Sequence, residues 1–438
     1  MKYISTRSSD VQYDFDEIVR KGIPDDGGLF VPENIIKFDE AYFINIQDKT
    51  FHEIAFDVSR TFIGTDIIPD EDLKIIIETA FNFDLPLVKV QKDLSVLELF
   101  HGPTSAFKDF GARFMANVLG FLQKKNDIKT TIVTATSGDT GGAVASAFHN
   151  VKDVNVFILY PKGRVSDFQE KQIAGLGDNI RAIEINGSFD DCQAMVKACF
   201  EDNKFKEDFN LTSSNSVNFS KIIPQIIYYF EAYRNAIAQG HKNVSFIVPS
   251  GNFGNITVAV YAKKMGLPMG KLIAATNAND AFPNYLQSGI YETNKSKRTI
   301  SNAMDVGNPS NLERIFYIFR STWNKIVQEF NSHSIDDQTT KTIIENYYNK
   351  YNYIVDPHTA VGIANYLLET MYHSDTHYIV LATAHPYKFE SVMHSVLPKL
   401  NIPTNTHINN YLNITIDKVS MTKDLEALKS YINKEVNN

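Results

Sequence analysis

The sequence of 438 residues has only two cysteines and no long apolar run. Cys192 and Cys199 are seven residues apart, which on a helix corresponds to about 10.5 Å along one face. A disulfide needs Cα atoms within about 7 Å, so we expect two free thiols and a reducing, cytoplasmic compartment. No stretch reaches about 18 uninterrupted apolar residues, so we predict no membrane span.

Positive charge is also scarce. Lys and Arg total 43 against 51 Asp and Glu, which gives a net charge of −8. A nucleic-acid-binding protein would normally present a basic face, so we expect no nucleic-acid partner. Acidic residues interrupt the first 20 positions, which therefore lack the apolar centre of a signal peptide. The length and composition fit a globular protein of two to three domains.

Several catalytic motifs are missing from the sequence. No Cys/His set has zinc spacing and no H-E-x-x-H segment occurs, so we predict no metal site. There is no G-x-S-x-G nucleophile elbow. The glycine-rich segments match neither a Walker loop nor the G-x-G-x-x-G fingerprint of dinucleotide binding. These absences argue against several common classes of hydrolase and dehydrogenase.

Runs rich in β-branched and aromatic residues alternate with helical segments. The first set of predicted strands covers residues 131–136, 154–160 and 180–185, with helices at 142–149, 167–174 and 189–200. The second set covers 244–248, 272–276 and 378–383, with helices at 256–265, 312–330 and 340–350. This alternation is typical of parallel sheets covered by helices. We therefore predict an α/β fold with two open, mainly parallel α/β domains.

The domain boundaries follow from the same pattern. We expect an N-terminal subdomain at residues 1–90, a smaller α/β domain at 110–205, and a larger α/β domain at 91–109 and 206–438 with a C-terminal extension. The polar segment 293–299 is predicted to be a surface loop. The tail from residue 404 onward is expected to end in a solvated helix.

Lys108 is the first candidate catalytic residue. It follows Phe107 and precedes Asp109 and Phe110, after a Gly-Pro turn and before a predicted helix at 111–119. Aromatic neighbours remove water from the amine and a helix N-terminus repels positive charge, and both effects lower an amine pKa. A neutral amine is what Schiff-base chemistry requires. From the residues alone, an ordinary surface cation stays open as the alternative.

Two glycine-rich segments follow predicted strands and open helices. The first is TSGDTGG from residue 136, and the second is PSGNFGN from residue 249. Free backbone N–H groups at such turns bind anions, and glycine lets a ligand approach the backbone closely. Ligands of open parallel sheets bind at the carboxyl ends of strands, so we predict two anion sites, for instance for a cofactor phosphate and a substrate carboxylate. Two unrelated helix-entry turns are the alternative.

Three other segments offer polar groups. Thr383 ends the last predicted core strand, where its hydroxyl can meet a ring nitrogen. The polar run at 213–218 supplies uncharged donors for phosphate oxygens, and Arg164 follows a strand with a side chain suited to bidentate phosphate contacts. Asp356 or His358 is expected to cap the helix that follows them.

Seven segments in a fixed order give the sequence a resemblance to the threonine synthase family, in its longer form with an extra N-terminal region. They are YISTR from residue 3, PDDGGLFVP from 24, HGPTSAFKDFGAR from 101, TSGDTG from 136, SGNFGN from 250, SNAMDVGNPSN from 301 and DPHTAVG from 356. The resemblance extends from about residue 3 to about residue 390. Ser105 is a mild departure, since an apolar side chain is expected there.

The resemblance implies a pyridoxal 5′-phosphate (PLP) enzyme of fold type II, the tryptophan-synthase-β-like fold. The family converts O-phospho-L-homoserine and water to L-threonine and phosphate, the last step of threonine biosynthesis, as a carbon–oxygen lyase. Lys108 would form the link to the cofactor, and its freed amine would remove the α-proton and then a β-proton. The implied cofactor-binding residues are Lys108, Gly251, Asn252, Phe253, Gly254, Asn255 and Thr383.

The resemblance also implies where the small-molecule substrate binds. Its carboxylate would bind the loop Thr136, Ser137, Gly138, Asp139 and Thr140. Its phosphate has the candidates Arg164, Ser214, Asn215 and Asn218. The oligomeric state is left open between a monomer and a homodimer.

Two other functions stay open. A related phospholyase would eliminate phosphate from the same substrate but release 2-oxobutyrate and ammonia. A non-catalytic α/β ligand-binding protein would keep the fold, and loss of Lys108 would have signalled it. The order of the motifs and the intact polar loops favour the synthase.

Overall fold

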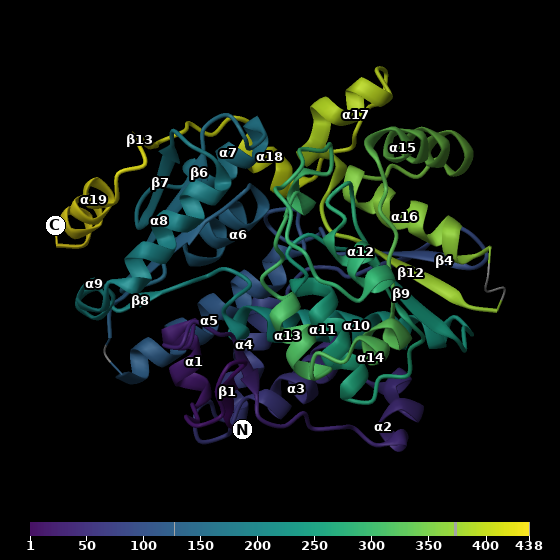
Figure 1. Cartoon of the computed structure of the whole chain (residues 1–438), viewed down its shortest axis with the longest axis horizontal. Helices are drawn as coiled ribbons and strands as arrows, with labels where there is room; N and C mark the ends of the chain where they lie inside the picture. The colour runs from purple at the N-terminus through teal and green to yellow at the C-terminus, as the bar shows by residue number, and fades with distance from the viewer. Residues whose placement is uncertain (127, 372–374, 438) are drawn as a thin grey trace.

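The computed structural model describes residues 1–126, 128–371 and 375–437 (Figure 1). Two sheets flanked by helices lie side by side, and the N-terminal helices form a layer beneath them in this view. The predicted α/β class with mainly parallel sheets and an N-terminal subdomain is confirmed.

The larger sheet has six strands in the described chain. In spatial order they are β11 (Phe330–Asn331), β10 (Leu272–Ala275), β9 (Val244–Pro249), β12 (His377–Ala382), β4 (Leu94–Glu98) and β3 (Leu87–Lys89). All neighbouring pairs are parallel except β3 with β4. Alternate residues of β9 face different cores: Phe246 and Val248 pack on one side and Ile247 on the other. The sheet is therefore covered on both faces, as parallel sheets require.

The smaller sheet has five parallel strands in the described chain. They lie in the order β13 (Val419–Met421), β7 (Ile180–Ile185), β6 (Val154–Pro161), β5 (Thr130–Ala135) and β8 (Leu211–Thr212). Its helices are α6 (Asp139–Phe148), α7 (Asp167–Ala174), α8 (Phe189–Glu201) and α9 (Asn203–Asp208). Every residue of β5 is buried, so this sheet also lies between two helical layers.

The N-terminal layer combines a small sheet with helices. Its elements are β1 (Tyr3–Ser5), α1 (Phe15–Lys21), β2 (Phe30–Pro32), α2 (Glu40–Ile44), the 3₁₀ turn η1 (Ile46–Asp48), α3 (Phe51–Phe62) and α4 (Asp70–Ala80). The remaining helices are α5 (Lys108–Asn126), α10 (Phe219–Ala238), α11 (Gly254–Lys264), α12 (Ala281–Ser288), η2 (Asn302–Met304), α13 (Leu312–Ile318), α14 (Trp323–Glu329), α15 (Asp337–Tyr351), α16 (Pro357–Glu369), η3 (Pro386–Phe389), α17 (Glu390–Val396), α18 (Thr406–Leu412) and α19 (Leu425–Asn437).

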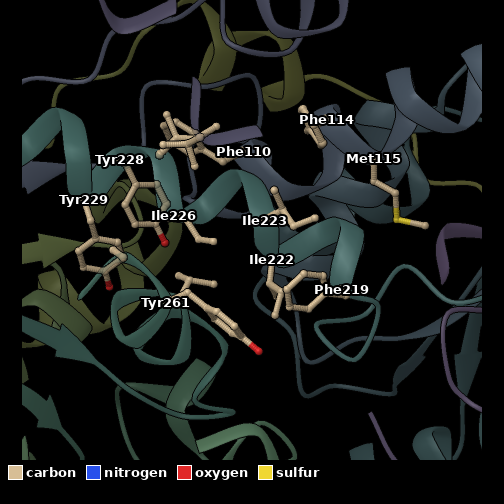
Figure 2. Packing of buried hydrophobic residues seen from close by; sticks show 14 of the residues in the cluster. Phe110, Phe114, Met115, Phe219, Ile222, Ile223, Ile226, Tyr228, Tyr229 and Tyr261 are labelled. Carbon is tan, nitrogen blue, oxygen red and sulfur yellow. The ribbon is translucent and has the colours of Figure 1, made fainter. Parts of the chain in front are cut away.

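Helix α10 is the centre of the main core. Its side chains Phe219, Ile222 and Ile226 pack against residues of α5 and α11, including Phe110 and Tyr261 (Figure 2). Residues 219–233 of this helix are all buried, which is typical of a helix enclosed on every side. The core thus holds α10 rigidly beside the first turn of α5, where Lys108 begins the helix.

The single helix predicted at 312–330 is wrong. The chain forms α13 and α14 instead, and Arg320 between them has a left-handed backbone with φ of 52°. The buried residues Ile315, Phe319 and Ile326 are spaced by four and seven positions, which fits one continuous helical face equally well. Apolar periodicity therefore could not reveal the break. The other predicted core elements are present, with ends shifted by a few residues.

The tail is not the solvated extension that we expected. Leu428 and Ile432 of α19 are fully buried in the core cluster that contains Cys192 and Cys199, and β13 pairs with β7. After α17 the chain crosses from the larger sheet back to the smaller one, as the yellow segment shows (Figure 1). Assigning all of 206–438 to the larger domain therefore disagrees with the sheet order. Both thiols are free, as predicted.

Candidate active site

The candidate segments gather at the carboxyl ends of strands. The Lys108 segment follows β4, the Thr383 segment follows β12 and the SGNFGN segment follows β9, and these three strands are neighbours in the larger sheet. The TSGDTG segment follows β5 of the smaller sheet. Carboxyl ends of parallel strands share one edge, so the larger sheet brings three of the four segments together.

Backbone hydrogen bonds join the lysine segment to the segment after β12. Phe107 N donates to Thr383 O at 2.9 Å, and His385 N donates to Ser105 O at 3.0 Å. Lys108 therefore lies beside the Thr383 segment. The Thr383 side chain has no hydrogen-bond partner among the described residues, so its hydroxyl is available to a ligand.

The amine of Lys108 is largely enclosed by protein. Burial lowers its pKa from 10.5 to about 8, while the charge of Asp139 acts in the opposite direction. Its Nζ lies 4.3 Å from the centre of the Phe107 ring. The lowered pKa expected from the aromatic neighbours is confirmed, with desolvation as its main cause.

The SGNFGN segment forms an open helix start. Phe253, the N-cap residue of α11, has φ of 59° and gives no side-chain cap. The first N–H groups of α11 have no hydrogen-bond partner among the described residues, so they can bind an anion. Gly251 has no space for a side chain, since an added Cβ would lie 2.7 Å from Met304 Cα.

Two asparagines of this segment differ in their bonding. Asn255 Oδ1 accepts hydrogen bonds from the hydroxyls of Tyr228 at 2.6 Å and Tyr229 at 2.7 Å, whereas its buried Nδ2 has no partner among the described residues. Asn252 donates from Nδ2 to Ser216 Oγ at 2.9 Å and accepts with Oδ1 from Ser310 N at 2.7 Å. The side chain of Asn252 therefore holds the scaffold, while an unpaired donor and a free helix start suit a phosphate group.

The TSGDTG loop leads into α6. Thr136 Oγ1 accepts a hydrogen bond from Gly138 N at 3.0 Å, so this hydroxyl fixes the turn. Gly138 has φ of 142°, and an added Cβ would lie 2.5 Å from the side chain of Gln169. The half-buried side chains of Ser137 and Thr140 have no hydrogen-bond partner among the described residues. Those two hydroxyls and the N-terminus of α6 are therefore open to a ligand.

Asp139 is the one carboxylate in this loop. It pairs with Lys388 Nζ at 3.0 Å and accepts a hydrogen bond from Gln169 Nε2 at 2.9 Å. Burial by itself raises the pKa of Asp139, but the charge of Lys388, these hydrogen bonds and the charge of His358 outweigh it and lower the pKa. The carboxyl group is therefore ionised inside the protein.

The four phosphate candidates have unequal surroundings. Ser214 is buried and its Oγ has no hydrogen-bond partner among the described residues. Asn215 Oδ1 accepts a hydrogen bond from the Thr134 hydroxyl of β5 at 2.7 Å. Asn218 caps α10 and donates to backbone carbonyls at 3.0 and 3.1 Å. Arg164 lies exposed in the turn after β6. Ser214 thus offers a free oxygen beside the site, while the Asn218 side chain is fully used in the scaffold.

Other kinds of site find no support in the described chain. Within residues 1–126, 128–371 and 375–437, no group of three or more His, Cys, Asp or Glu side chains could hold a metal ion. In the same ranges, no helix has the length and apolar character needed to cross a membrane. Asp356 caps α16 by accepting from His358 N at 2.8 Å, as predicted.

Comparison with known proteins identifies the family. A family model described as pyridoxal-phosphate dependent enzyme matches residues 86–383. Models of the threonine synthase N terminus and C-terminal part match residues 2–81 and 359–432. The chain belongs to the threonine synthase family.

Threonine synthases are similar to this chain over its whole length. The one from Buchnera aphidicola subsp. Acyrthosiphon pisum is 40% identical over 435 residues, which are 99% of each chain. The crystal structure of threonine synthase from Escherichia coli has a TM-score of 0.92 at 36% identity, covering 99% of this chain and all of that one. A PLP-bound threonine synthase from Brucella melitensis reaches 0.93 at 33% identity, with both chains fully covered. Threonine synthase function, fold type II and the PLP cofactor, all expected from the motifs, are confirmed.

The residues of this site fit PLP. The free start of α11 and the unpaired Asn255 Nδ2 suit its phosphate. Lys108 supplies an amine with a lowered pKa, and Thr383 supplies an unpaired hydroxyl next to the lysine segment. A phosphate cradle, an amine and a nearby hydroxyl are groups that can hold this cofactor.

Lys221 is not among the site residues predicted from the sequence. Its Nζ is buried and donates to Ser214 O. An added Cβ at Gly111, one turn after Lys108, would lie 2.5 Å from Lys221 O, so α10 and α5 touch there. Burial, and then the charge of Lys108, lower the pKa of Lys221 well below its ordinary value. The sequence feature that could have identified Lys221 is its position in the first helical turn after the polar run at 213–218.

A second missed residue is Arg314, which is fully buried in α13. Its Nε donates to Phe30 O at 3.0 Å and its Nη2 to Val217 O at 2.6 Å. Its Nη1 donates to Ser216 O at 3.0 Å and to Asn311 Oδ1 at 2.6 Å. Arg314 therefore connects the N-terminal layer to the polar run at 213–218. Nothing in the sequence pattern marks these contacts, which join segments far apart in the chain.

The lowered pKa of Lys108 predicts that its amine becomes reactive toward acetic anhydride at a lower pH than the amine of free lysine. In the cofactor-free enzyme, acetylation of Lys108 should reach half its maximal rate near pH 8, because only the neutral amine reacts. A free lysine derivative in the same solution should do so near pH 10.4. Pulse labelling with acetic anhydride and peptide mass spectrometry would measure both. Coincident curves would mean that the amine is not desolvated.

Proposed function

We propose that this site converts O-phospho-L-homoserine and water to L-threonine and phosphate with Lys108 as its acid and base. The observation that carries the proposal is the enclosed Lys108 amine, whose pKa is lowered to about 8. A group with a pKa near the working pH can both accept and donate a proton. The anion-binding helix starts of α6 and α11 supply the complementary binding groups.

The cofactor would be held at three points. The segment 251–255 would bind its phosphate, Lys108 would hold its aldehyde group, and the Thr383 hydroxyl would lie near its ring nitrogen. When bound, PLP accepts the negative charge that develops on the substrate carbon atoms. A hydroxyl at that position, rather than a carboxylate, would leave the ring nitrogen largely unprotonated.

Lys108 would carry out the proton transfers. Its freed amine would remove the α-proton of the substrate and later a β-proton, and phosphate leaves from Cγ. One of these protons returns to Cγ, which becomes the methyl group, and the other returns to Cα. Water adds its hydroxyl at Cβ, and its remaining proton balances the charge of the released phosphate. The first turn of α5 supports these steps, because Thr104 N and Oγ1 donate to the Asp109 carboxylate at 2.9 and 2.7 Å. These buried hydrogen bonds fix the backbone from which the lysine extends.

Two groups of residues near Lys108 would bind the substrate. Ser137, Thr140 and the start of α6 bind the carboxylate. Lys221 and the Ser214 hydroxyl bind the phosphate, because Lys221 is a buried amine with no carboxylate bonded to it among the described residues. An incoming phosphate supplies the missing negative charge and stabilises the protonated form of Lys221. Arg164 and Asn215 remain candidates for additional phosphate contacts.

Product analysis tests this function. The PLP-loaded enzyme mixed with O-phospho-L-homoserine should give threonine and phosphate in equal amounts, measured by ¹H and ³¹P NMR. Phosphate with 2-oxobutyrate and ammonia would instead identify a phospholyase. Bound cofactor without any turnover would mean that the substrate is wrong while the PLP site is correct.

The assembly and location of the enzyme are also proposals. The acidic surface and the two free thiols support a cytoplasmic monomer or homodimer that acts on a small molecule. Sedimentation equilibrium of the full chain would decide between the two oligomeric states.

A further inference from the structure

The loop assigned to the substrate carboxylate contains a carboxylate of its own. Asp139 is the first residue of α6, it is buried, and its lowered pKa keeps it ionised. Two negative charges a few ångströms apart repel each other strongly in a dry site. An anion-binding loop with an ionised aspartate at its centre therefore needs a fixed positive charge.

Lys388 supplies that charge from a different part of the chain. It lies in η3 after β12 and is 1% exposed. Its Nζ contacts Asp139 Oδ1 at 3.0 Å, Thr104 O at 2.8 Å and Gln172 Oε1 at 2.6 Å. An ammonium has three N–H donors, so all three are used, one each on α6, the lysine segment and α7. The ammonium therefore sits in a fixed position and has no donor left for a substrate.

Gln169 and Gln172 complete the arrangement with uncharged groups. Gln169 Nε2 donates to Asp139 Oδ1 at 2.9 Å, and Gln172 Nε2 donates to Thr104 O at 2.9 Å. Both glutamines lie in α7 and are 1% exposed. The neutral amides add hydrogen bonds without adding charge, so Lys388 is the one cation in direct contact with Asp139 among the described residues, while Lys108 and His358 act on that carboxylate from a greater distance.

We propose that Lys388 is a positioning residue that neutralises Asp139, so that the start of α6 accepts the substrate carboxylate. The proposal rests on the assignment of the carboxylate to this loop. Lys388 acts through Asp139 and does not touch the substrate itself. The same ammonium joins the loops of the two sheets, so the charge balance of the carboxylate site and the contact between the sheets depend on one side chain.

A pair of ligands that differ only in the carboxylate tests the proposal. L-2-Amino-5-phosphonopentanoate matches the substrate with a methylene in place of the ester oxygen, and 4-aminobutylphosphonate lacks the carboxylate. Calorimetry on the PLP-loaded enzyme gives both Kd values. In Lys388→Met, Kd for the first ligand should rise roughly 10- to 100-fold, while Kd for the second changes little. Lys388→Arg keeps the charge and should restore most of the difference.

A double variant separates charge from packing. Asp139→Asn removes the repulsive charge and keeps the shape, so Asp139→Asn with Lys388→Met should recover the ratio of the two Kd values that Lys388→Met loses. Lys399→Met, an exposed lysine of the same region, serves as the matched control and should leave the ratio unchanged. If Lys388→Met does not fold, Asp139→Asn alone still decides, because it should keep or strengthen binding of the carboxylate ligand.

Two results would overturn the proposal. In Lys388→Met, equal weakening of both ligands would show a purely structural role, and in Asp139→Asn, weaker binding of the carboxylate ligand would show that the aspartate does not oppose it. Failure of the proposed function looks different, because the unmodified enzyme would then bind both ligands equally poorly.

Discussion

Lys108→Ala should lower kcat/KM for threonine formation by at least about 10,000-fold. The substitution removes the amine that we propose bonds to the cofactor and carries every proton transfer. Lys221, on the neighbouring helix α10, donates to Ser214 O in the polar run before that helix. The rate would be measured by coupled phosphate release and by NMR of threonine.

The same variant should keep its fold and lose a spectral signature. The side chain begins α5 at the edge of a core centred on α10, so its removal leaves the core packing intact. Absorbance of the lysine-bound cofactor should vanish, while the helix start of α11 still retains some PLP through its phosphate. Lys124→Ala, an exposed lysine on the same helix, is the matched control. Near-normal turnover in Lys108→Ala would refute the assignment of the catalytic amine.

Lys221→Met should reduce kcat/KM by about 100-fold, which corresponds to the 1.5–3 kcal/mol of one charged hydrogen bond. The loss should be larger for the phosphate-bearing substrate than for an amino acid without phosphate, such as L-2-aminobutyrate, whose Kd should barely change. Methionine fills the buried space without leaving an unpaired donor. Steady-state kinetics and binding titrations would give both quantities.

The positive charge of residue 221 is the property under test, so the control variant must keep a cation there. Lys221→Arg places a cation at the same position of α10 and should retain most of the activity. A result in which both variants lose equal activity would point to packing beside Gly111, where the two helices touch, rather than to phosphate binding. Equal loss of affinity for ligands with and without phosphate would lead to the same conclusion.

The sequence predicted the architecture well because its signals are local. Predicted strands that alternate with predicted helices indicated two parallel sheets. The glycine-rich turns indicated helix N-termini, and those of α6 and α11 are accessible to a ligand in the structure. The lowered pKa of Lys108 followed from its aromatic neighbours. In each case, a few adjacent residues contain the physical cause.

The parts that could not be predicted depend on distant contacts or on ambiguous spacing. Asp139 forms an ion pair with Lys388, and Arg314 donates a hydrogen bond to Phe30 O; in both cases the partners are more than two hundred residues apart in sequence. The Asn218 side chain could serve a ligand or cap a helix, and the distinction depends on the carbonyls that surround it. Apolar positions in α13 and α14 fit one helix or two, so the tertiary packing decided between them.

The position of β13 has a consequence for synthesis on the ribosome. The free edge of β7 is complete at Ile185, but the strand that covers it begins at Val419, about 230 residues later. At translation rates of about 5–20 residues per second, that edge waits about 10–50 s for its partner. An uncovered parallel strand is a template for pairing with other chains. Slow elongation over the last part of the message would therefore lengthen the period in which the nascent enzyme can aggregate.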